Sequence, residues 1–280
     1  MTEIRVWVDG ALVHADTPAV SAVDHGVTVG DGAFETAKVD RGEPFAVTRH
    51  LRRLDRTMVG LGLPPVDHDR IREGIDAVLA GPTIDFGRLR FTVTGGRGPL
   101  GSDRHDSDLT HIVTAVPHAR PEAHGAVVTV PWVRNERAAT AGLKTTSYAD
   151  NVIALAYAKE RGALEALFAN TRGELCEATG SNVFVVLDGV VRTPPLDSGC
   201  LAGITRELVL EWCADEGVKV VEEALPLGVL ERADEVFLTS SIKDVFPVSA
   251  VDGRTVAVPG PVTSSIREVW ARRSAEGMDP

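Results

Sequence analysis

The sequence predicts an α+β fold in two domains, and three observations lead to this prediction. The 280 residues suffice for one large or two modest domains, each with its own core. Strand-like and helix-like segments occur together along the chain, in the layer arrangement of α+β proteins. The polar segment over residues 117–125 carries two prolines and is the best candidate for a linker. We therefore expect domains over residues 1–117 and 126–280, with the linker at 118–125.

The N-terminal half is predicted to contain strands and two helices. Strands are expected near residues 4–8, 11–14, 33–39, 44–47, 88–94 and 111–116. Leu51 and Leu54 interrupt the basic run Arg49 to Arg56 at helical spacing, which indicates an amphipathic helix. Helices are therefore expected near residues 48–61 and 67–80.

The C-terminal half repeats this mixture. Strands are expected at 126–132, 165–169, 182–193, 218–222 and 235–239, and helices at about 148–162, at 205–217 and from about 262. Asp188-Gly189 is a strong signal for a hairpin turn. Gly203-Ile204-Thr205 opens an apolar helical run, so the backbone N–H groups of its first turn would hold a phosphate well.

Composition excludes several classes of protein. With 44% hydrophobic and 25% charged residues, the chain is not expected to be disordered. The net charge of −11 argues against nucleic-acid binding, and no apolar run approaches the roughly 18 residues that span a bilayer. The three cysteines show no metal-ligand spacing, so we expect no metal site, and an odd number of cysteines suits a reducing cytoplasm.

Lys144 is the first candidate for a chemical role. It is one of only five lysines and lies in the small, uncharged sequence Gly-Leu-Lys-Thr-Thr-Ser. A lysine with no carboxylate beside it can lose part of its charge on burial, as a Schiff-base nucleophile must. The alternative is a solvated surface lysine.

A longer pattern downstream favours the chemical role. Glu177 is followed by Thr179, by Asn182-Val183-Phe184, by Thr193 and by Leu201-Ala202-Gly203-Ile204-Thr205-Arg206. With Lys144, this pattern closely resembles the signature of class IV pyridoxal-phosphate aminotransferases. The resemblance extends over essentially the whole chain, through segments that include residues 24–26, 30–36, 50–54 and 237–241.

The resemblance implies a fold, a cofactor and an assembly. The fold would be a small N-terminal α/β domain and a larger C-terminal pseudo-barrel that binds pyridoxal phosphate. The enzyme would act on a small-molecule amine and form a homodimer. Lys144 would hold the cofactor as a Schiff base and serve as the base for the Cα proton. Glu177 would bond the pyridine nitrogen, whereas Glu174 is assigned to the surface.

Further roles follow from the same resemblance. The cofactor phosphate would be bound by Ile204, Thr205, Arg53 and Ser241, while Arg52 is assigned to solvated surface. Tyr148 is either a ligand of the cofactor's phenolic oxygen or a plain core or rim tyrosine. On the substrate side the candidates are Phe34, Thr36, Arg97 and Lys243, each of which could equally be structural.

Within the family, the segment Gly30–Thr36 looks most like 4-amino-4-deoxychorismate lyases and D-amino-acid aminotransferases. The latter carry a tyrosine at the position of Phe34 and an Arg-x-His pair after a strand. Residues 92–98 lack that pair, and residues 96–101 reproduce the glycine-rich lyase segment only in part. We therefore expect a lyase that forms 4-aminobenzoate and pyruvate for folate synthesis. The alternatives are a transaminase that uses a 2-keto acid and a non-catalytic relative.

Overall fold

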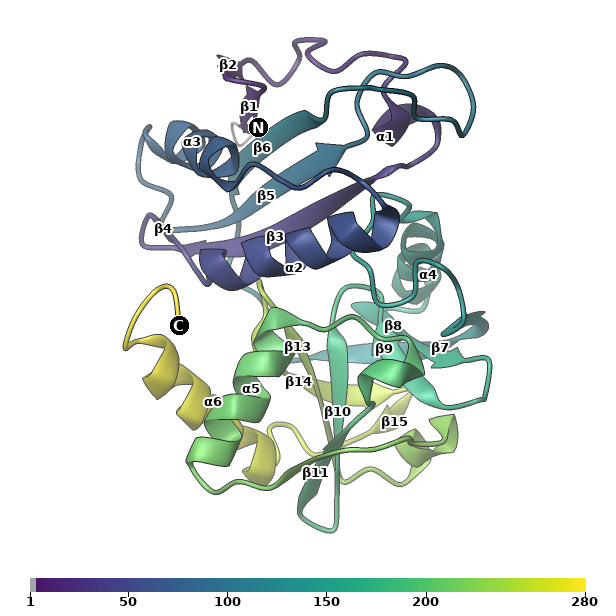
Figure 1. Ribbon diagram of the computed structural model, residues 1–280. Coiled ribbons are helices and arrows are strands. Elements are labelled where there is room, and N and C mark those ends of the chain that lie inside the picture. Colours follow the sequence, from purple (N-terminus) through teal and green to yellow (C-terminus); the bar gives the residue numbers. More distant parts are fainter. Residues whose placement is uncertain (1–3) are drawn as a thin grey trace. The chain divides into compact units, whose positions relative to one another are not determined.

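The computed structural model describes residues 4–280 and contains two curled β-sheets, of six and nine strands (Figure 1). The chain divides by its internal contacts into two compact units. Unit 1 contains the chain up to Arg120 together with Leu143–Tyr148 and Met278–Pro280; unit 2 contains Pro121–Gly142 and Ala149–Gly277. The predicted α+β class is confirmed. The sequence prediction put residues 143–148 in the domain over 126–280, whereas they belong to unit 1.

Unit 1 is built on an antiparallel six-stranded sheet in the order β2-β1-β6-β5-β3-β4. The strands are β1 (Arg5–Val8), β2 (Ala11–Val13), β3 (Gly32–Asp40), β4 (Glu43–Pro44), β5 (Phe86–Thr94) and β6 (Thr110–Pro117). β3 and β5 pair along nine residues each, with Phe34 opposite Thr92 and Thr36 opposite Arg90. Since side chains alternate between the faces of a sheet, these four lie on one face.

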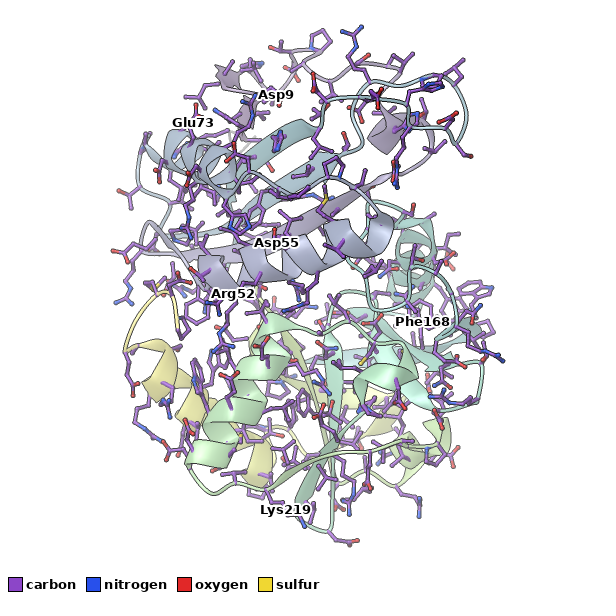
Figure 2. All side chains as sticks on the ribbon, in the orientation of Figure 1. Asp9, Arg52, Asp55, Glu73, Phe168 and Lys219 are labelled. Carbon is purple, nitrogen blue, oxygen red and sulfur yellow. The ribbon has the colours of Figure 1, made fainter. Side chains whose placement is uncertain are left out.

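The other face of this sheet carries the core of unit 1. Its alternate apolar side chains meet α2 (Val47–Leu61) and α3 (His68–Leu79), which lie on that face in Figure 1. α2 buries Leu51, Leu54 and Met58, the helical spacing predicted from the sequence. Arg52, labelled on α2 in Figure 2, is exposed as expected, whereas its neighbour Arg53 is buried.

Unit 2 contains a nine-stranded sheet in the order β12-β11-β10-β13-β14-β7-β8-β9, with β15 beside β14. Helices α5 and α6 pack together against β13 and β14, and α4 packs on β8. The strands are β7 (Gly125–Arg134), β8 (Glu165–Asn170), β9 (Leu175–Ala178), β10 (Asn182–Leu187), β11 (Val190–Thr193), β12 (Val220–Glu222), β13 (Glu235–Ser240), β14 (Asp244–Val251) and β15 (Arg254–Thr255). The helices are α4 (Ala149–Glu160), α5 (Ile204–Asp215) and α6 (Pro261–Ser274).

Most predicted elements are present, and the differences have local causes. The expected strand at 182–193 is the hairpin β10–β11, whose turn residues Asp188 and Gly189 both have positive φ, as the Asp-Gly signal requires. The expected strand at 44–47 is wrong beyond Pro44, because the chain turns at Ala46 (φ 57°) and α2 begins at Val47. No strand was predicted at β14 or β15, and no helix at the four-residue α1 (His25–Thr28). Over residues 4–280, no helix has the length and apolar character to cross a membrane.

Candidate active site

Lys144 lies in unit 1, attached to the edge of β3. The Phe34 N–H donates to the Lys144 carbonyl (3.0 Å), the Thr146 N–H donates to the Gly32 carbonyl (2.8 Å), and Thr145 forms a bridge with Ala33. These bonds hold the segment against β3 as an isolated antiparallel bridge. The Lys144 N–H also donates to the Thr57 hydroxyl of α2 (3.3 Å). The backbone of the lysine is therefore held by both the sheet and a helix.

The Lys144 amine lies among aromatic rings. Its Nζ is 4.4 Å from the centroid of the Phe34 ring and 5.6 Å from that of Tyr148. The two rings meet edge to face, with centroids 5.2 Å apart. Phe34, Tyr148 and Lys144, which were predicted separately, are thus brought together in unit 1. The role of Tyr148 as a ligand of the cofactor stays a prediction.

Arg53 is buried in the same unit and pairs with Glu35. Its Nε donates to Glu35 Oε1 (2.8 Å) and its Nη2 to Glu35 Oε2 (2.5 Å). The His50 Nδ1 lies 2.7 Å from Oε2. Because a carboxylate only accepts, this nitrogen must carry the proton. The two-bond pairing orients the guanidinium of Arg53, and two of its five N–H groups are used in doing so.

The charges of this buried group follow from its contacts. Burial by itself would raise the pKa of Glu35, but the charge and hydrogen bonds of Arg53, with those of His50, lower it to about 2. Burial lowers the pKa of His50; the hydrogen bond and charge of Glu35 oppose this shift, and the charges of Arg53 and Lys144 add to it. At neutral pH the group is therefore a carboxylate, a guanidinium and a neutral imidazole.

Glu177 lies in unit 2, on β9. Its Oε2 accepts the backbone N–H of Leu201 (3.0 Å), and its Oε1 is 3.3 Å from Nε of Arg134. Arg134 also stacks on Phe168, with Cζ 4.2 Å from the ring centroid, and Phe168 is the cross-strand partner of Glu177. Phe168 is labelled in Figure 2. The carboxylate of Glu177 is therefore held by an amide and a guanidinium that the sequence did not connect with it.

Ile204 and Thr205 form the first turn of α5 and are both buried. Gly203, at the N-cap, supplies no side-chain cap, so the first N–H groups of the helix depend on other partners. Asn182 supports this turn: its Nδ2 donates to the Leu201 carbonyl (2.8 Å). An added Cβ at Gly203 would lie 2.0 Å from the Asn182 Oδ1, so any other residue here would have to displace the Asn182 side chain.

Two further members of the sequence pattern have structural contacts. The Thr193 hydroxyl donates to the Val183 carbonyl (2.8 Å) and joins the two strands of the hairpin. Arg206 Nη2 donates to the Pro194 carbonyl (2.9 Å) and pairs with Glu222. These bonds hold the loop between β11 and α5. These residues of the motif therefore hold together the hairpin, the loop after it and the N-terminus of α5.

Ser241 and Lys243 lie in unit 2, between β13 and β14. Ser241 is half-buried. Lys243 forms an ion pair with Glu165, a buried carboxylate that also accepts hydrogen bonds from Thr179, Gly180 and Ser181. Burial raises the pKa of Glu165, but the charge and hydrogen bond of Lys243, with those of Ser181 and Gly180, bring it below its ordinary value. Lys243 thus has a structural partner, and its substrate role stays a prediction.

The remaining substrate-side candidates belong to unit 1. Thr36 is half-buried on the same sheet face as Phe34. Arg97 follows β5 in an exposed loop, where its carbonyl accepts the Ser107 hydroxyl. Arg104, further along this loop, makes two 2.6 Å bonds to Asp31. The structure thus places Thr36 beside Phe34, whereas Arg97 is exposed and contacts Ser107 and Asp24 through its backbone.

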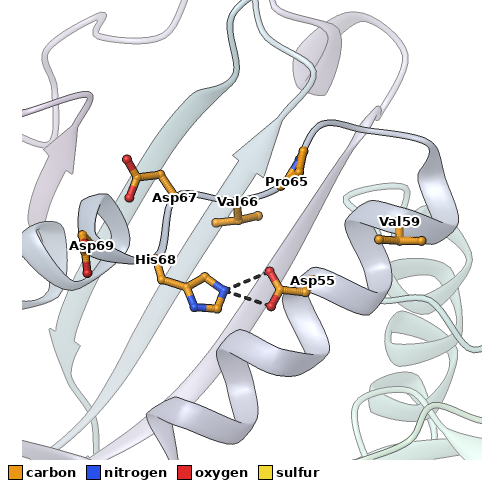
Figure 3. A pocket seen from close by; sticks show the side chains of 7 residues that line it. All are labelled: Asp55, Val59, Pro65, Val66, Asp67, His68 and Asp69. Atoms are coloured by element: carbon orange, nitrogen blue, oxygen red, sulfur yellow. Dashed lines mark hydrogen bonds and ion pairs between the residues drawn. The ribbon is translucent and has the colours of Figure 1, made fainter.

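A surface hollow of about 490 Å³ in unit 1 contains none of the predicted residues. It is lined by Asp55, Val59, Pro65, Val66, Asp67, His68 and Asp69, and Figure 3 shows His68 directed at the Asp55 carboxylate, 2.9 Å from both oxygens. Asp67 caps α3 by accepting the Arg70 N–H. Within residues 4–280, no three His, Cys, Asp or Glu side chains are placed to hold a metal ion. The hollow is therefore not the candidate site.

Sequence reasoning missed several titratable residues near the predicted ones: Glu35, His50, Arg90, Arg134 and Glu165. For Glu35 and His50 a signal existed, since both lie inside segments quoted for the family resemblance. Arg90 is the alternate residue to Thr92 on β5, but its position opposite Thr36 depends on strand register. Register follows from tertiary pairing, which one sequence does not reveal.

The sequence is similar to those of known aminotransferases and of a lyase. The family described as amino-transferase class IV matches residues 32–251. D-alanine aminotransferase of Bacillus licheniformis is 30% identical over 94% of this chain and 95% of its own, and aminodeoxychorismate lyase of Bacillus subtilis is 28% identical over 88% and 86%.

Solved structures of aminotransferases are also similar to this chain. A branched-chain aminotransferase from Thermoproteus uzoniensis superposes with a TM-score of 0.88 and 27% identity, over 97% of this chain and 94% of that one. A hypothetical aminotransferase from Mycobacterium tuberculosis, in its PLP-bound form, has a TM-score of 0.85 and 26% identity, over 96% and 97%. Because the family match spans most of the sequence, this chain belongs to the class IV aminotransferase family of enzymes.

Proposed function

We propose that this enzyme uses pyridoxal phosphate to act on a primary amine, with Lys144 as the residue that binds the cofactor covalently. When bound, the cofactor supplies an electron sink for the bond that breaks next to the amine. The observation that carries the proposal is the Lys144 amine, held over Phe34 by a segment whose backbone is bonded to β3 and α2.

The side chains of unit 2 fit this cofactor. The α5 terminus has no side-chain cap, and a methyl group at Gly203 would overlap Asn182. The hydroxyl of Thr239, directly across from Asn182 in the sheet, is buried without a hydrogen-bond partner. An uncapped helix N-terminus and a buried donor are suited to a phosphate group. We propose that Ile204, Thr205 and Ser241 bind the phosphate, as does Arg53 of unit 1.

Glu177 and Lys144 then have separate roles. Glu177, held by the Leu201 N–H and Arg134, would accept a hydrogen bond from the pyridine nitrogen and stabilise its charged form. Lys144, when its amine is displaced by a substrate, would take a proton from the substrate carbon. The rings of Phe34 and Tyr148 limit the directions from which that amine can be approached.

For the reaction itself we propose 4-amino-4-deoxychorismate lyase activity, which yields 4-aminobenzoate and pyruvate. Two features support it. Phe34, which carries no hydroxyl, is the nearer of the two rings beside the Lys144 amine, and residues 92–98, at the end of β5 and just after it, contain no Arg-x-His pair. A relative of that name is 28% identical to this chain.

Transamination with a 2-keto acid is the second candidate. It is supported by the relative named D-alanine aminotransferase, which is 30% identical over nearly the full length. The two candidates differ in one requirement: a lyase consumes no acceptor, whereas a transaminase stops after one amine per site unless a keto acid is supplied.

One experiment separates them. The enzyme is incubated with aminodeoxychorismate, without any keto acid, and pyruvate is measured per active site. Many turnovers are expected for a lyase. Absence of pyruvate, together with turnover of amino acids only when a keto acid is added, would refute the lyase proposal in favour of transamination.

The role of Lys144 has its own test. Lys144→Ala should abolish the visible absorption of the bound cofactor and lower turnover by several orders of magnitude, since the covalent anchor and the base are lost together. Lys219→Ala is the matched control, because Lys219, labelled in Figure 2, is exposed at the far end of α5 in unit 2. Retained absorption in Lys144→Ala would contradict the assignment.

A further inference from the structure

Helix α2 begins without a cap of its own. Its N-cap residue is Ala46, which has φ 57° and whose methyl group accepts no hydrogen bond, and the first turn of the helix contains no acidic residue. The first N–H groups of a helix have no partner inside the helix, and a polar or negatively charged side chain at the N-terminus normally satisfies them. For α2 this side chain comes from a distant part of the sequence.

Asp279 supplies the missing cap. Its Oδ1 accepts the Thr48 N–H (2.9 Å), and its Oδ2 accepts the Thr48 hydroxyl (2.5 Å). Thr48 is the second residue of the helix, one of the two positions whose N–H an N-cap side chain usually binds. Asp279 is 231 positions away in the sequence, and Met278–Pro280 belong to unit 1 although residues 149–277 belong to unit 2.

Two further bonds hold this segment beside the helix. The Met278 carbonyl accepts the Ala46 N–H (2.6 Å), and the Pro280 carbonyl accepts Nε of Arg49 (2.8 Å). With the two bonds of Asp279, four hydrogen bonds join three consecutive residues to the start of one helix. This contact therefore fixes where α2 begins.

The capped turn is connected to the candidate site. The His50 N–H donates to the Ala46 carbonyl (3.1 Å) and closes the first turn of α2. The His50 ring bonds Glu35, and the same buried carboxylate orients Arg53 through two hydrogen bonds. If the first turn frays, His50 leaves Glu35, and the carboxylate that orients Arg53 loses one of its partners. The cap, His50, Glu35 and Arg53 are thus one connected set of contacts within unit 1.

We propose that Asp279 is a positioning residue for cofactor binding: by capping α2 it keeps Arg53 oriented for the cofactor phosphate. The inference rests on the proposed function, of which the contact between Arg53 and the phosphate is a part. Asp279 is exposed and negatively charged. Loss of its charge alone would favour a bound anion, whereas loss of the cap would weaken phosphate binding, so the two effects have opposite signs.

Equilibrium titrations with pyridoxal phosphate and with pyridoxal test this role. The two ligands differ only in the phosphate, so the ratio of their dissociation constants measures the phosphate contribution. In Asp279→Ala the preference for pyridoxal phosphate should fall about threefold, within the limit of about fivefold set by the strength of an N-cap. Asp279→Asn should keep the wild-type preference, because asparagine caps a helix as well as aspartate. Unchanged pyridoxal affinity shows that the site is folded.

Asp67→Ala is the matched control. Asp67 caps α3 of the same unit by accepting the Arg70 N–H (3.0 Å), and α3 carries none of the residues proposed to bind the cofactor. Its replacement should lower Tm about as much as Asp279→Ala and leave the preference for pyridoxal phosphate unchanged. Hydrogen exchange of the Thr48 amide reports the cap directly. It should be faster in Asp279→Ala than in wild type and unaffected by Asp67→Ala.

Four results would overturn the inference: unchanged exchange of the Thr48 amide in Asp279→Ala, an unchanged or higher phosphate preference in that variant, an equal loss in Asp279→Asn, or an equal loss in Asp67→Ala. Arg53→Ala tests the proposed function separately, since it should lower the preference more than the other variants do. An unchanged preference in Arg53→Ala would refute the phosphate role of Arg53 and the inference with it. A loss in Arg53→Ala but not in Asp279→Ala would refute the inference alone.

Discussion

Gly203→Ala is the substitution that tests the α5 terminus most directly. Gly203 has φ −69° and ψ 137°, which alanine adopts without strain. The added methyl carbon, however, would lie 2.0 Å from Oδ1 of Asn182. Asn182 must then move, and the 2.8 Å bond from its Nδ2 to the Leu201 carbonyl is lost. The effect therefore comes from one contact whose atoms are known.

The magnitude follows from that contact. A buried carbonyl left unpaired costs about 1–3 kcal/mol, and because the Leu201 carbonyl is only partly buried we expect about 1 kcal/mol. For a protein somewhat above 150–250 residues this corresponds to a fall in Tm of about 2–4 °C per kcal/mol. Because Leu201 also donates its N–H to Glu177, and Ile204 begins the helix three residues later, we expect the affinity for pyridoxal phosphate to fall about tenfold, or about 1.4 kcal/mol.

Thermal unfolding and a cofactor titration measure the two effects. Gly228→Ala is the control, because Gly228 has no atom within 4 Å of an added Cβ and no positive φ. In an Asn182→Ala background the methyl group has lost its obstacle, so Gly203→Ala should then cost little more. Wild-type stability and cofactor affinity in Gly203→Ala, or full additivity of the two substitutions, would refute the reasoning.

Three further predictions concern charge and reactivity. Glu177→Gln should keep the cofactor but lose about 2 kcal/mol or more of transition-state stabilisation, measured as kcat/KM, because a neutral amide no longer favours a charged pyridine; wild-type turnover would assign that role to another acid. The pKa of Glu35 is lowered to about 2 in the folded enzyme, so its carboxylate contributes about 3 kcal/mol above pH about 4.3 that is lost as the pH falls towards 2. Urea unfolding of Glu35→Gln and wild type should therefore differ less at pH 3 than at pH 7, and a difference independent of pH would contradict this. Burial raises the pKa of Cys200 and Cys213 to about 11 and raises the pKa of Cys176 further. All three thiols should therefore react slowly with iodoacetamide until the enzyme unfolds. Rapid alkylation of any of them in the folded enzyme would contradict this prediction.

Most helices and strands could be predicted from the sequence, because local turn and helix signals agreed with the hydrophobic pattern. Leu51 and Leu54 indicated α2, and Asp188-Gly189 placed the β10–β11 hairpin. Gly203-Ile204-Thr205 marked the start of α5 to within a residue. Each of these signals acts within a few residues of the chain. β14 was missed although Phe246-Pro247-Val248 lies inside it, because Pro247 is an unfavourable strand residue.

Residues of the candidate site could be predicted only where their type and their spacing along the chain formed a recognisable motif. Lys144, Glu177 and Thr205 were predicted from the motif, and Phe34, which was predicted for the substrate side, contacts the Lys144 amine. The pairing of Arg53 with Glu35 joins a helix to a strand, so it depends on how α2 packs on β3. Arg134, 43 positions before Glu177, reaches it only through the pairing of β7 with β8 and of β8 with β9. Such contacts have no local signal.

The attachment of residues 143–148 to unit 1 has a consequence for how the chain must fold. The stretch on either side of this segment belongs to unit 2, so unit 1 is discontinuous in sequence. A fragment that ends at Arg120 would leave the Gly32–Phe34 edge of β3 without its partner strand, and open strand edges recruit other chains. During synthesis this edge stays open until Tyr148 has been added. The lysine segment therefore completes the first unit as well as supplying its amine.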